Sequence, residues 1–376
     1  NIKNYLEQTN QATNSNFESN GRFHTDWLNM MYPRLRLARN LLTEDGVIFI
    51  SIDENEVSNL RKLCDEIYGE ENFITQITVL CNPKGRSQDK YFATNHEYIL
   101  VYSKSLLNKG DFSIEKEKDQ IESEYPEIDE NGQRYRLIEL RNTHRDFGKH
   151  NRRNLFYPFF VNTKTGKITL EKNDGLIEVL PIWNDGFEGC WTWDKNKSSK
   201  DLGELMAKNV NGRWKIYRKN YAKGAKKMLK TIFNEKEYYT EKGQATFSDL
   251  FNTKEKIFQS PKSVELIKTL LKTSTTKNDI IMDFFSGAAT AAHAVMELNA
   301  EDMGNRKFIM VQLPELTYEK SPAYKAGYNN ICEIGKERIR RAGEKIIEEI
   351  GNTDLDIGFK VFKLDSSNLK TWDPDT

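Results

Sequence analysis

The chain has 376 residues, of which 38% are hydrophobic and 30% are charged, a composition typical of a folded protein large enough for two domains. No apolar run approaches the roughly 20 residues of a membrane-spanning helix, so we expect no membrane span. The four cysteines are far apart, so we expect neither a disulfide nor a zinc site, which fits a reducing cytoplasm. The net charge is zero, but the charged residues are unevenly distributed. Residues 131–230 hold 22 Lys and Arg against 10 Asp and Glu, whereas the rest of the chain holds 34 Lys and Arg against 46 Asp and Glu.

The first 105 residues predict the first part of an α/β domain, after a polar stretch that reads as a loop. Apolar residues recur at helical spacing in two places and form near-continuous runs in three others, the first of which is typical of a strand buried in a parallel sheet. The predicted elements are helices over 24–42 and 55–68 and strands over 47–53, 73–80 and 96–102. The polar, basic loop 82–95 has two open interpretations: contact with DNA or a cofactor, or simple exposure.

Residues 106–254 predict a second, basic module inserted between two parts of the first domain. Its cations are interleaved with aromatic residues, among them Tyr135, Phe147, Phe156, Tyr157, Phe159, Phe160, Trp191, Trp193, Trp214 and Tyr221. Arg and Lys neutralise phosphates, and aromatic rings stack on bases displaced from a duplex. We therefore predict that Arg152, Arg153, Arg213, Arg218 and Lys219 contact nucleic acid. A small β-rich domain with an aromatic core is the alternative.

Three further helices are predicted after residue 222. Residues 223–232 read as a short basic helix and residues 238–244 as a turn. The segment F-Q-S-P-K-S leads into a helix over 264–271, with Pro261 in its first turn. A long helix over 324–350 carries a charged face that includes Lys336, Arg338, Arg340 and Arg341. A last strand is predicted over 359–364.

The stretch from Asp279 to Glu315 predicts one βαβ unit of a nucleotide-binding sheet. An apolar run over 279–285 is followed by small residues, a helical pattern and a second apolar run over 307–313. Gly287 permits a sharp turn, and its small neighbours let an adenosine-bearing ligand approach the main chain. Glu315 is placed to accept hydrogen bonds from ribose hydroxyls. A βαβ unit without a ligand is the alternative.

The same turn argues against a dinucleotide cofactor. Sites for NAD use G-x-G-x-x-G so that a pyrophosphate can lie against bare backbone, whereas Ala288 and Ala289 follow Gly287 here. The pattern D-x-F-x-G, formed by Asp283, Phe285 and Gly287, resembles instead the first motif of S-adenosylmethionine-dependent methyltransferases.

Longer strings resemble one family in particular. DFFSG, AHAVMELNAED, GNRKFI and VQLPE, together with TDWLNMMYPRLRLARNLL, GVIFISID and FQSPKSVELI, are similar to the modification subunit of type III restriction systems. Members of that bacterial family are DNA adenine-N6 methyltransferases of the circularly permuted beta order. The family usually has Gly or another small residue where Ala289 stands, so we expect this alanine to cost little beyond a methyl group. It usually has Thr where Ala291 stands, and the lost hydroxyl is expected to weaken cofactor binding.

The resemblance implies an α/β fold: a Rossmann-like S-adenosylmethionine-dependent methyltransferase sheet with an inserted basic target-recognition domain. Residues 1–105 and 255–376 are then the methyltransferase domain, and residues 106–254 are the DNA target-recognition domain. The implied partners are double-stranded DNA, a second copy of the chain and a restriction subunit with helicase and nuclease activity. The residues expected around S-adenosylmethionine are Lys262, Asp283, Phe285, Ser286, Gly287, Thr290 and Glu315. His293, just past the turn, is interpreted as a packing or capping residue.

The tetrapeptide that carries the chemistry of such enzymes, (Asp/Asn/Ser)-Pro-Pro-(Tyr/Phe/Trp), does not occur in these 376 residues. It orients the amine of a flipped-out adenine and stacks on the base. The beta order places it upstream of Asn1, so the chain reads as an internal piece of a longer protein with no catalytic residue of its own, and we expect no DNA methylation by this chain alone. Two alternatives stay open: a non-catalytic DNA-binding remnant, and an RNA or protein methyltransferase on the same fold.

Overall fold

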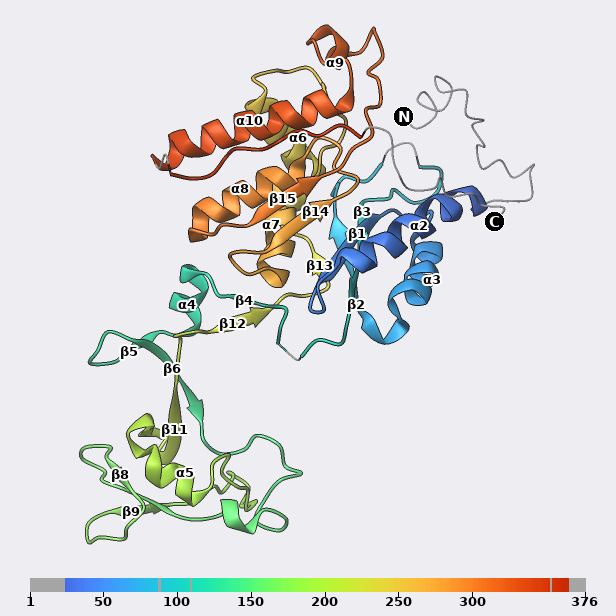
Figure 1. Ribbon diagram of the computed structural model, residues 1–376. Coiled ribbons are helices and arrows are strands. Elements are labelled where there is room, and N and C mark those ends of the chain that lie inside the picture. The colour runs from blue at the N-terminus through green and yellow to red at the C-terminus, as the bar shows by residue number, and fades with distance from the viewer. Residues whose placement is uncertain (1–23, 87–88, 109, 352–353, 365–376) are drawn as a thin grey trace. The chain divides into compact units, whose positions relative to one another are not determined.

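The computed structural model describes residues 24–86, 89–108, 110–351 and 354–364 and contains two compact units (Figure 1). The first unit joins Asn1–Ser113 to Met228–Thr376, and the second is Ile114–Lys227. The predicted insertion, residues 106–254, is longer than the second unit, because residues 228–254 supply a strand and a helix to the first unit.

The first unit contains both helices and strands in each of its two parts. Its N-terminal part contains α2 (Thr25–Leu41), β1 (Val47–Ile52), α3 (Val57–Tyr68), η2 (Glu70–Asn72), β2 (Phe73–Leu80) and β3 (His96–Ser103). Its C-terminal part contains β13 (Ile232–Phe233), η5 (Lys236–Tyr238), α6 (Thr240–Leu250), α7 (Val264–Ser274), β14 (Ile280–Asp283), α8 (Thr290–Asp302), β15 (Lys307–Met310), α9 (Pro322–Lys325) and α10 (Ile331–Ile350). The two chain segments at the unit boundary form a two-stranded ribbon of β4 (Ser113–Glu115) and β12 (Lys226–Met228).

One sheet of this unit has the strand order β1-β3-β2-β13. The predicted strand 47–53 is present as β1, but its expected parallel setting is wrong, because β1 pairs antiparallel with β3. Both faces of the sheet are covered. Leu100 and Tyr102 pack with α2 and α3 on one face, whereas Ile99 and Val101 pack with α7 on the other. This alternation explains why the strands read as continuous apolar runs.

The predicted βαβ unit is confirmed. Strands β14 and β15 are parallel, with Asp283 opposite Met310, and α8 connects them. Within the described residues these two strands form a sheet of their own rather than part of the β1 sheet. Helices α8 and α10 lie side by side over one face of the pair (Figure 1), and their buried residues share one core with Phe308 and Met310.

Four predicted elements differ from the structure. Residues 223–232 are not helical, because Gly224 turns the chain with a φ of +70° and β12 follows. The predicted turn at 238–244 is the end of η5 and the start of α6. The helix predicted from 324 is broken by Gly327, with a φ of +90°, and α10 starts afresh after its N-cap Asn330. Residues 359–364 have no strand pairing among the described residues.

The second unit is a small β-rich domain. Its elements are α4 (Lys118–Glu124), β5 (Glu127–Ile128), β6 (Arg134–Glu139), η3 (Arg153–Leu155), β7 (Phe159–Val161), β8 (Ile168–Thr169), β9 (Ile177–Val179), α5 (Lys195–Lys200), η4 (Leu202–Glu204), β10 (Leu205–Val210) and β11 (Arg213–Tyr221). They form the sheets β10-β11-β6-β5 and β8-β7-β9. Tyr157, Phe159 and Trp191 are buried in the core between them, so these aromatic residues serve packing rather than base stacking.

Candidate cofactor site and nucleic-acid surface

The connection between β14 and α8 is a tight turn joined to the residues after β15. Asp283 accepts a hydrogen bond from the N–H of Phe285 at 3.1 Å. Ser286 donates its N–H to the first carbonyl after β15 at 3.2 Å, and Gly287 donates its N–H to Oε1 of Gln312 at 2.7 Å. The main chain of the turn is therefore fixed by its own residues and by the neighbouring strand segment.

Two residues of the turn have a left-handed backbone. Gly287 has a φ of +50°, and a Cβ there would lie 3.3 Å from Cζ of Phe258. Ala289, the N-cap of α8, has a φ of +57°. A residue with a side chain costs about 1–2 kcal/mol in this conformation. The expectation that Ala289 costs little beyond a methyl group is therefore wrong, because its backbone is strained as well.

Asp283 and Phe285 give the turn its chemical character. Burial raises the pKa of the Asp283 carboxyl, and the hydrogen bond from the Phe285 N–H opposes that rise. A cation beside this carboxylate would favour its charged form. The ring of Phe285 is 53% exposed, and it follows a strand whose residues are exposed or only partly buried. The turn thus combines a carboxylate in a low-dielectric setting with an uncovered aromatic ring.

Helix α10 supports the turn through a buried arginine. The side chain of Arg338 is fully buried, and its NH1 atom donates to Oγ1 of Thr290 at 2.7 Å. Its Nε and NH2 atoms have no hydrogen-bond partner among the described residues. Burial lowers the pKa of Arg338 to about 10. Arg338 was predicted on the charged face of this helix, but the structure buries it, and its contact with the turn is one that sequence reasoning missed.

Close backbone approach brings α10 to the same place. A Cβ on Gly335 would lie 3.3 Å from the carbonyl oxygen of Gly287 and 3.6 Å from Cβ of Ala289. Cys332, at the start of α10, donates its S–H to the carbonyl of Gln312 at 3.4 Å. Gln312 thus connects α10 and the turn. This glutamine lies in the string VQLPE, and no local sequence signal indicates its contact with the turn.

The segment before α7 is held against β3 and α6. Lys262 forms an ion pair with Glu97 of β3. A Cβ on Gly243 of α6 would collide with the carbonyl oxygen of Pro261, so only glycine allows this approach. Ser263 is the N-cap of α7. The prediction that Pro261 lies in the first turn of this helix is therefore wrong, because Pro261 precedes the N-cap.

The structure distributes the predicted cofactor residues over three places. The first place is the turn after the strand that carries Asp283, where Phe285, Ser286, Gly287 and Thr290 lie. Lys262 stands apart beside Glu97. Glu315 is half-buried, and its carbonyl accepts the N–H of Ile331, the first residue of α10, at 2.9 Å.

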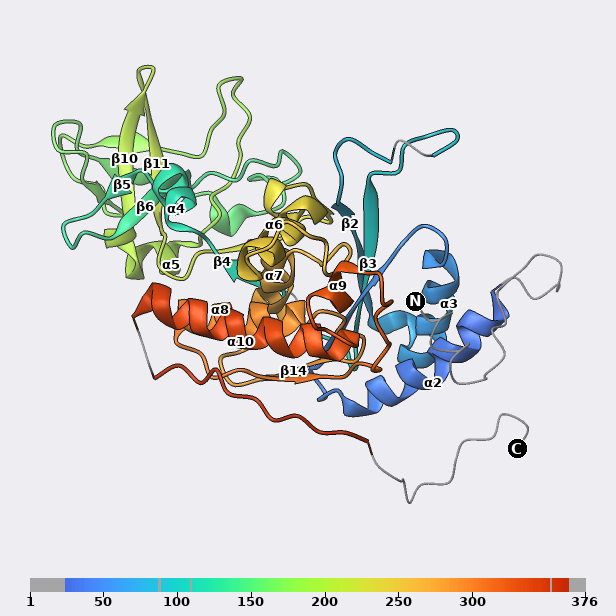
Figure 2. The same cartoon turned by 90° about the horizontal axis from the view of Figure 1, so that it is seen from above.

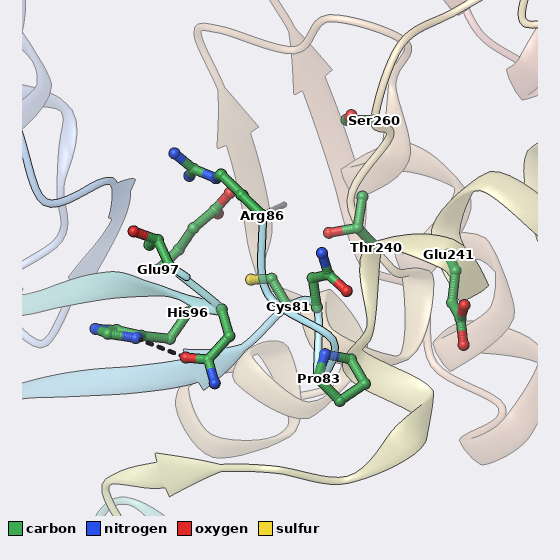
Figure 3. A pocket seen from close by; sticks show the side chains of 11 residues that line it. Cys81, Pro83, Arg86, His96, Glu97, Thr240, Glu241 and Ser260 are labelled. Carbon is green, nitrogen blue, oxygen red and sulfur yellow. Dashed lines mark hydrogen bonds between the residues drawn. The ribbon is translucent and has the colours of Figure 1, made fainter. Parts of the chain in front are cut away.

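A polar cavity of about 430 Å³ opens where β2 ends. It is lined by Cys81, Asn82, Pro83, Arg86, Thr94, Asn95, His96, Glu97, Thr240, Glu241 and Ser260. Figure 3 shows His96 and Glu97 on one side and Thr240 and Glu241 on the other. The cavity has the size of a small-molecule site and offers hydrogen-bond donors and acceptors from several segments.

His293 is buried in α8 and packs as predicted. Its Nε2 atom lies 3.0 Å from Oε1 of Glu297, one helical turn further on. Burial lowers the pKa of His293, and the hydrogen bond with Glu297 opposes that shift. Its other ring nitrogen has no partner among the described residues. These contacts indicate a structural rather than a chemical role.

The five cations predicted to bind nucleic acid occupy two parts of the second unit. Arg152 and Arg153 are exposed at the start of η3, and Arg152 lies 5.3 Å from the ring of Phe147. Strand β11 carries Arg213, Arg218 and Lys219. Because side chains alternate along a strand, Arg218 lies on the opposite face from Arg213 and Lys219. Not all five cations can therefore lie on a single face.

Many other cations of this unit are already paired with acids. Measured between side-chain N and O atoms, the pairs Arg145–Asp185, Lys149–Glu188, Arg141–Glu139 and Lys215–Glu139 are separated by 2.6, 2.7, 2.9 and 3.1 Å. These pairs neutralise part of the positive charge of residues 131–230. The local charge available to a phosphate is thus smaller than the count of residues suggests.

Two classes of feature are not found in the part of the chain that the structure describes. No helix there is both long and apolar enough to cross a membrane. Nor does any group of three or more His, Cys, Asp or Glu side chains lie close enough together to hold a metal ion, within that same part.

A family model described as DNA methylase matches residues 5–329. The modification subunit of the type III restriction-modification enzyme EcoPI, from Escherichia phage P1, is 36% identical over 90% of this chain and 53% of its own length. The type II methyltransferase M.KpnI of Klebsiella pneumoniae is 33% identical over 84% of this chain and 74% of its own. The StyLTI modification subunit of Salmonella typhimurium is 32% identical over 93% of this chain and 50% of its own. The chain thus spans about half the length of its type III relatives, and it belongs to the DNA methylase family.

Proposed function

We propose that this chain forms the cofactor-binding and target-recognition parts of an S-adenosylmethionine-dependent DNA adenine-N6 methyltransferase of the type III modification-subunit kind. The observation that carries the proposal is the turn over residues 283–290, in a chain of the DNA methylase family. The turn joins a partly buried carboxylate, an exposed ring and a glycine without a side chain at the end of a βαβ strand. This combination suits a ligand that has an amino group and an adenosine but no phosphate.

The residues of the turn fit such a ligand in distinct roles. Asp283 would accept a hydrogen bond from the ligand's ammonium group, which also favours the ionised carboxylate. Phe285 offers a ring face, and Gly287 leaves room for close approach of the ligand. Glu315 would accept from ribose hydroxyls. Ser286 completes the turn through its main chain.

Two residues have supporting rather than contacting roles in this proposal. The hydroxyl of Thr290 accepts from Arg338 and still has a proton to donate toward the ligand. Lys262 is engaged with Glu97 and fixes the segment that leads into α7. In the family, this segment covers the methionine end of the cofactor. We infer that the ion pair positions this cover.

The reaction of the whole enzyme would be direct methyl transfer. When bound, S-adenosylmethionine would supply the methyl group for transfer to the adenine amine, and the residues of the turn would hold the cofactor. The contribution of this chain is alignment, because holding two reactants in line removes much of the entropic barrier. The second unit would hold the duplex, with Arg152, Arg153, Arg213, Arg218 and Lys219 as the proposed phosphate and base contacts.

Two protein partners belong to the same proposal: a second copy of the chain, and a restriction subunit with helicase and nuclease activity. The relatives from phage P1 and Salmonella are modification subunits of restriction-modification enzymes, which supports this assignment. Light scattering of the purified chain tests the first partner, where a mass of one chain at micromolar concentration would contradict it. Co-purification with a restriction subunit tests the second.

The decisive experiment measures two affinities of the full chain. Calorimetry with S-adenosylmethionine and fluorescence anisotropy with a mixed-sequence DNA duplex should both give saturable binding. DNA binding without cofactor binding would replace the proposal with the non-catalytic remnant, and tighter binding to RNA of the same sequence would replace it with an RNA enzyme. A tritiated-methyl assay should show no transfer by this chain alone, because it lacks the Pro-Pro tetrapeptide.

A further inference from the structure

The loop between β2 and β3, whose residues 82–86 and 89–95 the structure describes, exposes two neighbouring aromatic side chains. Tyr91 is 81% exposed and Phe92 is 91% exposed. Aromatic side chains contribute much of the apolar area that proteins bury, so two adjacent uncovered rings are unfavourable for the isolated chain. Figure 2 shows that the loop extends beyond the ends of both strands, away from the helices of the first unit.

The base of this loop is fixed by hydrogen bonds. Cys81 and Asn82 both donate their N–H groups to the carbonyl of Asn95, at 2.9 and 3.0 Å. Further out, Arg86 donates its N–H to the carbonyl of Thr94 at 3.0 Å. The loop therefore leaves the sheet as an anchored hairpin.

Two more contacts extend this order to the residues around the rings. The N–H of Thr94 donates to a carboxylate oxygen of Asp89 at 2.7 Å, bridging the two sides of the ring-bearing segment. Gly85, with a φ of +71°, would place a Cβ 2.5 Å from Cβ of Ala93, so the two strands of the hairpin touch there. Tyr91 and Phe92 thus stand outward on an ordered support.

The loop that carries the two rings also carries the cations Lys84, Arg86 and Lys90. Nζ of Lys90 is 5.0 Å from the ring centroid of Tyr91, and Arg86 forms an ion pair with Glu54 at 3.4 Å. The one acid of the described loop residues, Asp89, is engaged by the N–H of Thr94. The pattern is unlike a protein-binding surface, where lysine is depleted around the buried aromatic residues. It is the combination found where proteins bind unpaired nucleic acid, with aromatic rings for the bases and cations for the backbone.

We propose that Tyr91 and Phe92 stack on DNA bases that have left the duplex. The proposal rests on the function proposed above and adds to it a second DNA contact, located on the methyltransferase unit and selective for unpaired bases. The loop also supplies Pro83, Arg86 and Asn95 to the polar cavity at the end of β2. Stacking beside this cavity would hold open the strand from which a base is displaced, so part of the cost of unstacking is recovered by the rings.

The test compares two DNA probes of one sequence, a fully paired duplex and the same duplex with a short central run of unpaired bases. Anisotropy titrations of the full chain give the ratio of the two affinities, in which the general attraction of cations for phosphates largely cancels. Wild-type protein should prefer the unpaired probe. The variant Tyr91→Ala/Phe92→Ala should lower that preference by about tenfold and change duplex affinity by less than about twofold.

Two further variants make the result specific to aromatic stacking. Tyr91→Phe/Phe92→Tyr keeps both rings and should keep the preference. Tyr318→Ala removes a ring that is 61% exposed in the same unit but lies outside the loop, and it should also keep the preference. Thermal melting of each variant shows that the fold is intact.

The outcomes separate this inference from the proposed function. Absence of binding to either probe by the wild-type chain would overturn the proposed function and this inference with it. Binding to both probes without preference, or an unchanged preference in the double alanine variant, would overturn this inference alone. A preference lost with the rings and kept by the swap and by Tyr318→Ala would support it.

Discussion

The turn of the first unit and the basic surface of the second unit are built from different kinds of contact. The turn is fixed by backbone hydrogen bonds and by a fully buried guanidinium, with donor–acceptor distances such as 2.7 Å from Gly287 to Gln312. The surface consists of exposed cations, of which Arg152 and Arg153 are examples, and many neighbouring cations are already neutralised by acids.

This difference predicts how each region responds to change. Substitutions in the turn act through geometry inside the protein, where salt has little effect. Substitutions on the surface act through charge in water, where interactions are screened over about 10 Å at 0.1 M salt. The first region therefore decides whether the ligand fits, and the second decides how strongly a polyanion is attracted.

The largest effect is expected for Gly287→Val. A β-branched residue is disfavoured at the φ of +50°, and its side chain would meet the ring of Phe258, so S-adenosylmethionine binding should be lost while the protein still melts cooperatively. Calorimetry and thermal melting measure the two properties. Gly224→Val is the matched control, because Gly224 has a φ of +70° and no atom within 4 Å of an added Cβ. Tight cofactor binding by Gly287→Val would remove the ligand from this turn.

Arg338→Met should weaken S-adenosylmethionine binding by about tenfold, because a hydrogen bond from a charged group contributes about 1.5–3 kcal/mol. Stability should change by less than about 2 kcal/mol, since removing a buried charge with two unpartnered nitrogens offsets the lost contact. The exposed Arg340 of the same helix provides the control Arg340→Met. Equal cofactor affinity of the two variants would show that Arg338 does not position the turn.

Charge reversal of the surface should have a smaller effect that depends on salt. Arg152→Glu/Arg153→Glu should lower DNA affinity several-fold at low salt and progressively less as salt rises. Filter binding over a salt series measures this slope. Lys164→Glu/Lys167→Glu makes the same charge change in the loop between β7 and β8. An equal loss in that control would mean that overall charge, rather than the η3 cations, attracts DNA.

The smallest effect is a pH dependence of folding from His293. Burial lowers its pKa below the ordinary value of 6.5, so the unfolded chain binds more protons below that pH. The contribution of His293 to the free energy of unfolding should be fully present above about pH 6.5. It should fall as the pH drops below that value, by at most about 1.4 kcal/mol per pH unit. Denaturant titrations of His293→Gln should show a shallower acid slope than wild type. His144→Gln, at an exposed position of the second unit, should leave the slope unchanged.

Much of the fold could be predicted from local patterns. The helices α2 and α3, the strands β1 to β3 and the βαβ unit follow from apolar spacing, because periodicity reports which face of an element is buried. Errors occurred where a single residue overrides the pattern. Gly224 prevents the helix predicted over 223–232, and Gly327 interrupts the helix predicted over 324–350, because both residues have a positive φ.

The candidate site shows the same division. Asp283, Phe285 and Gly287 could be found because their chemistry follows from a short motif. Arg338 and Gln312 could not, because both are far in sequence from the turn that they contact.

By itself, the sequence determined the family, the βαβ unit and the excess of positive charge in residues 131–230, because each of these follows from neighbouring residues or from their types. Only the tertiary structure decided which cations remain accessible, which arginine is buried behind the turn, and that the rings of Tyr91 and Phe92 stand outward. The physical reason is that burial depends on what the rest of the chain places against a residue. Arg338 and Arg340 are two positions apart on one helix, yet the first is fully buried and the second has a side chain that is 51% exposed.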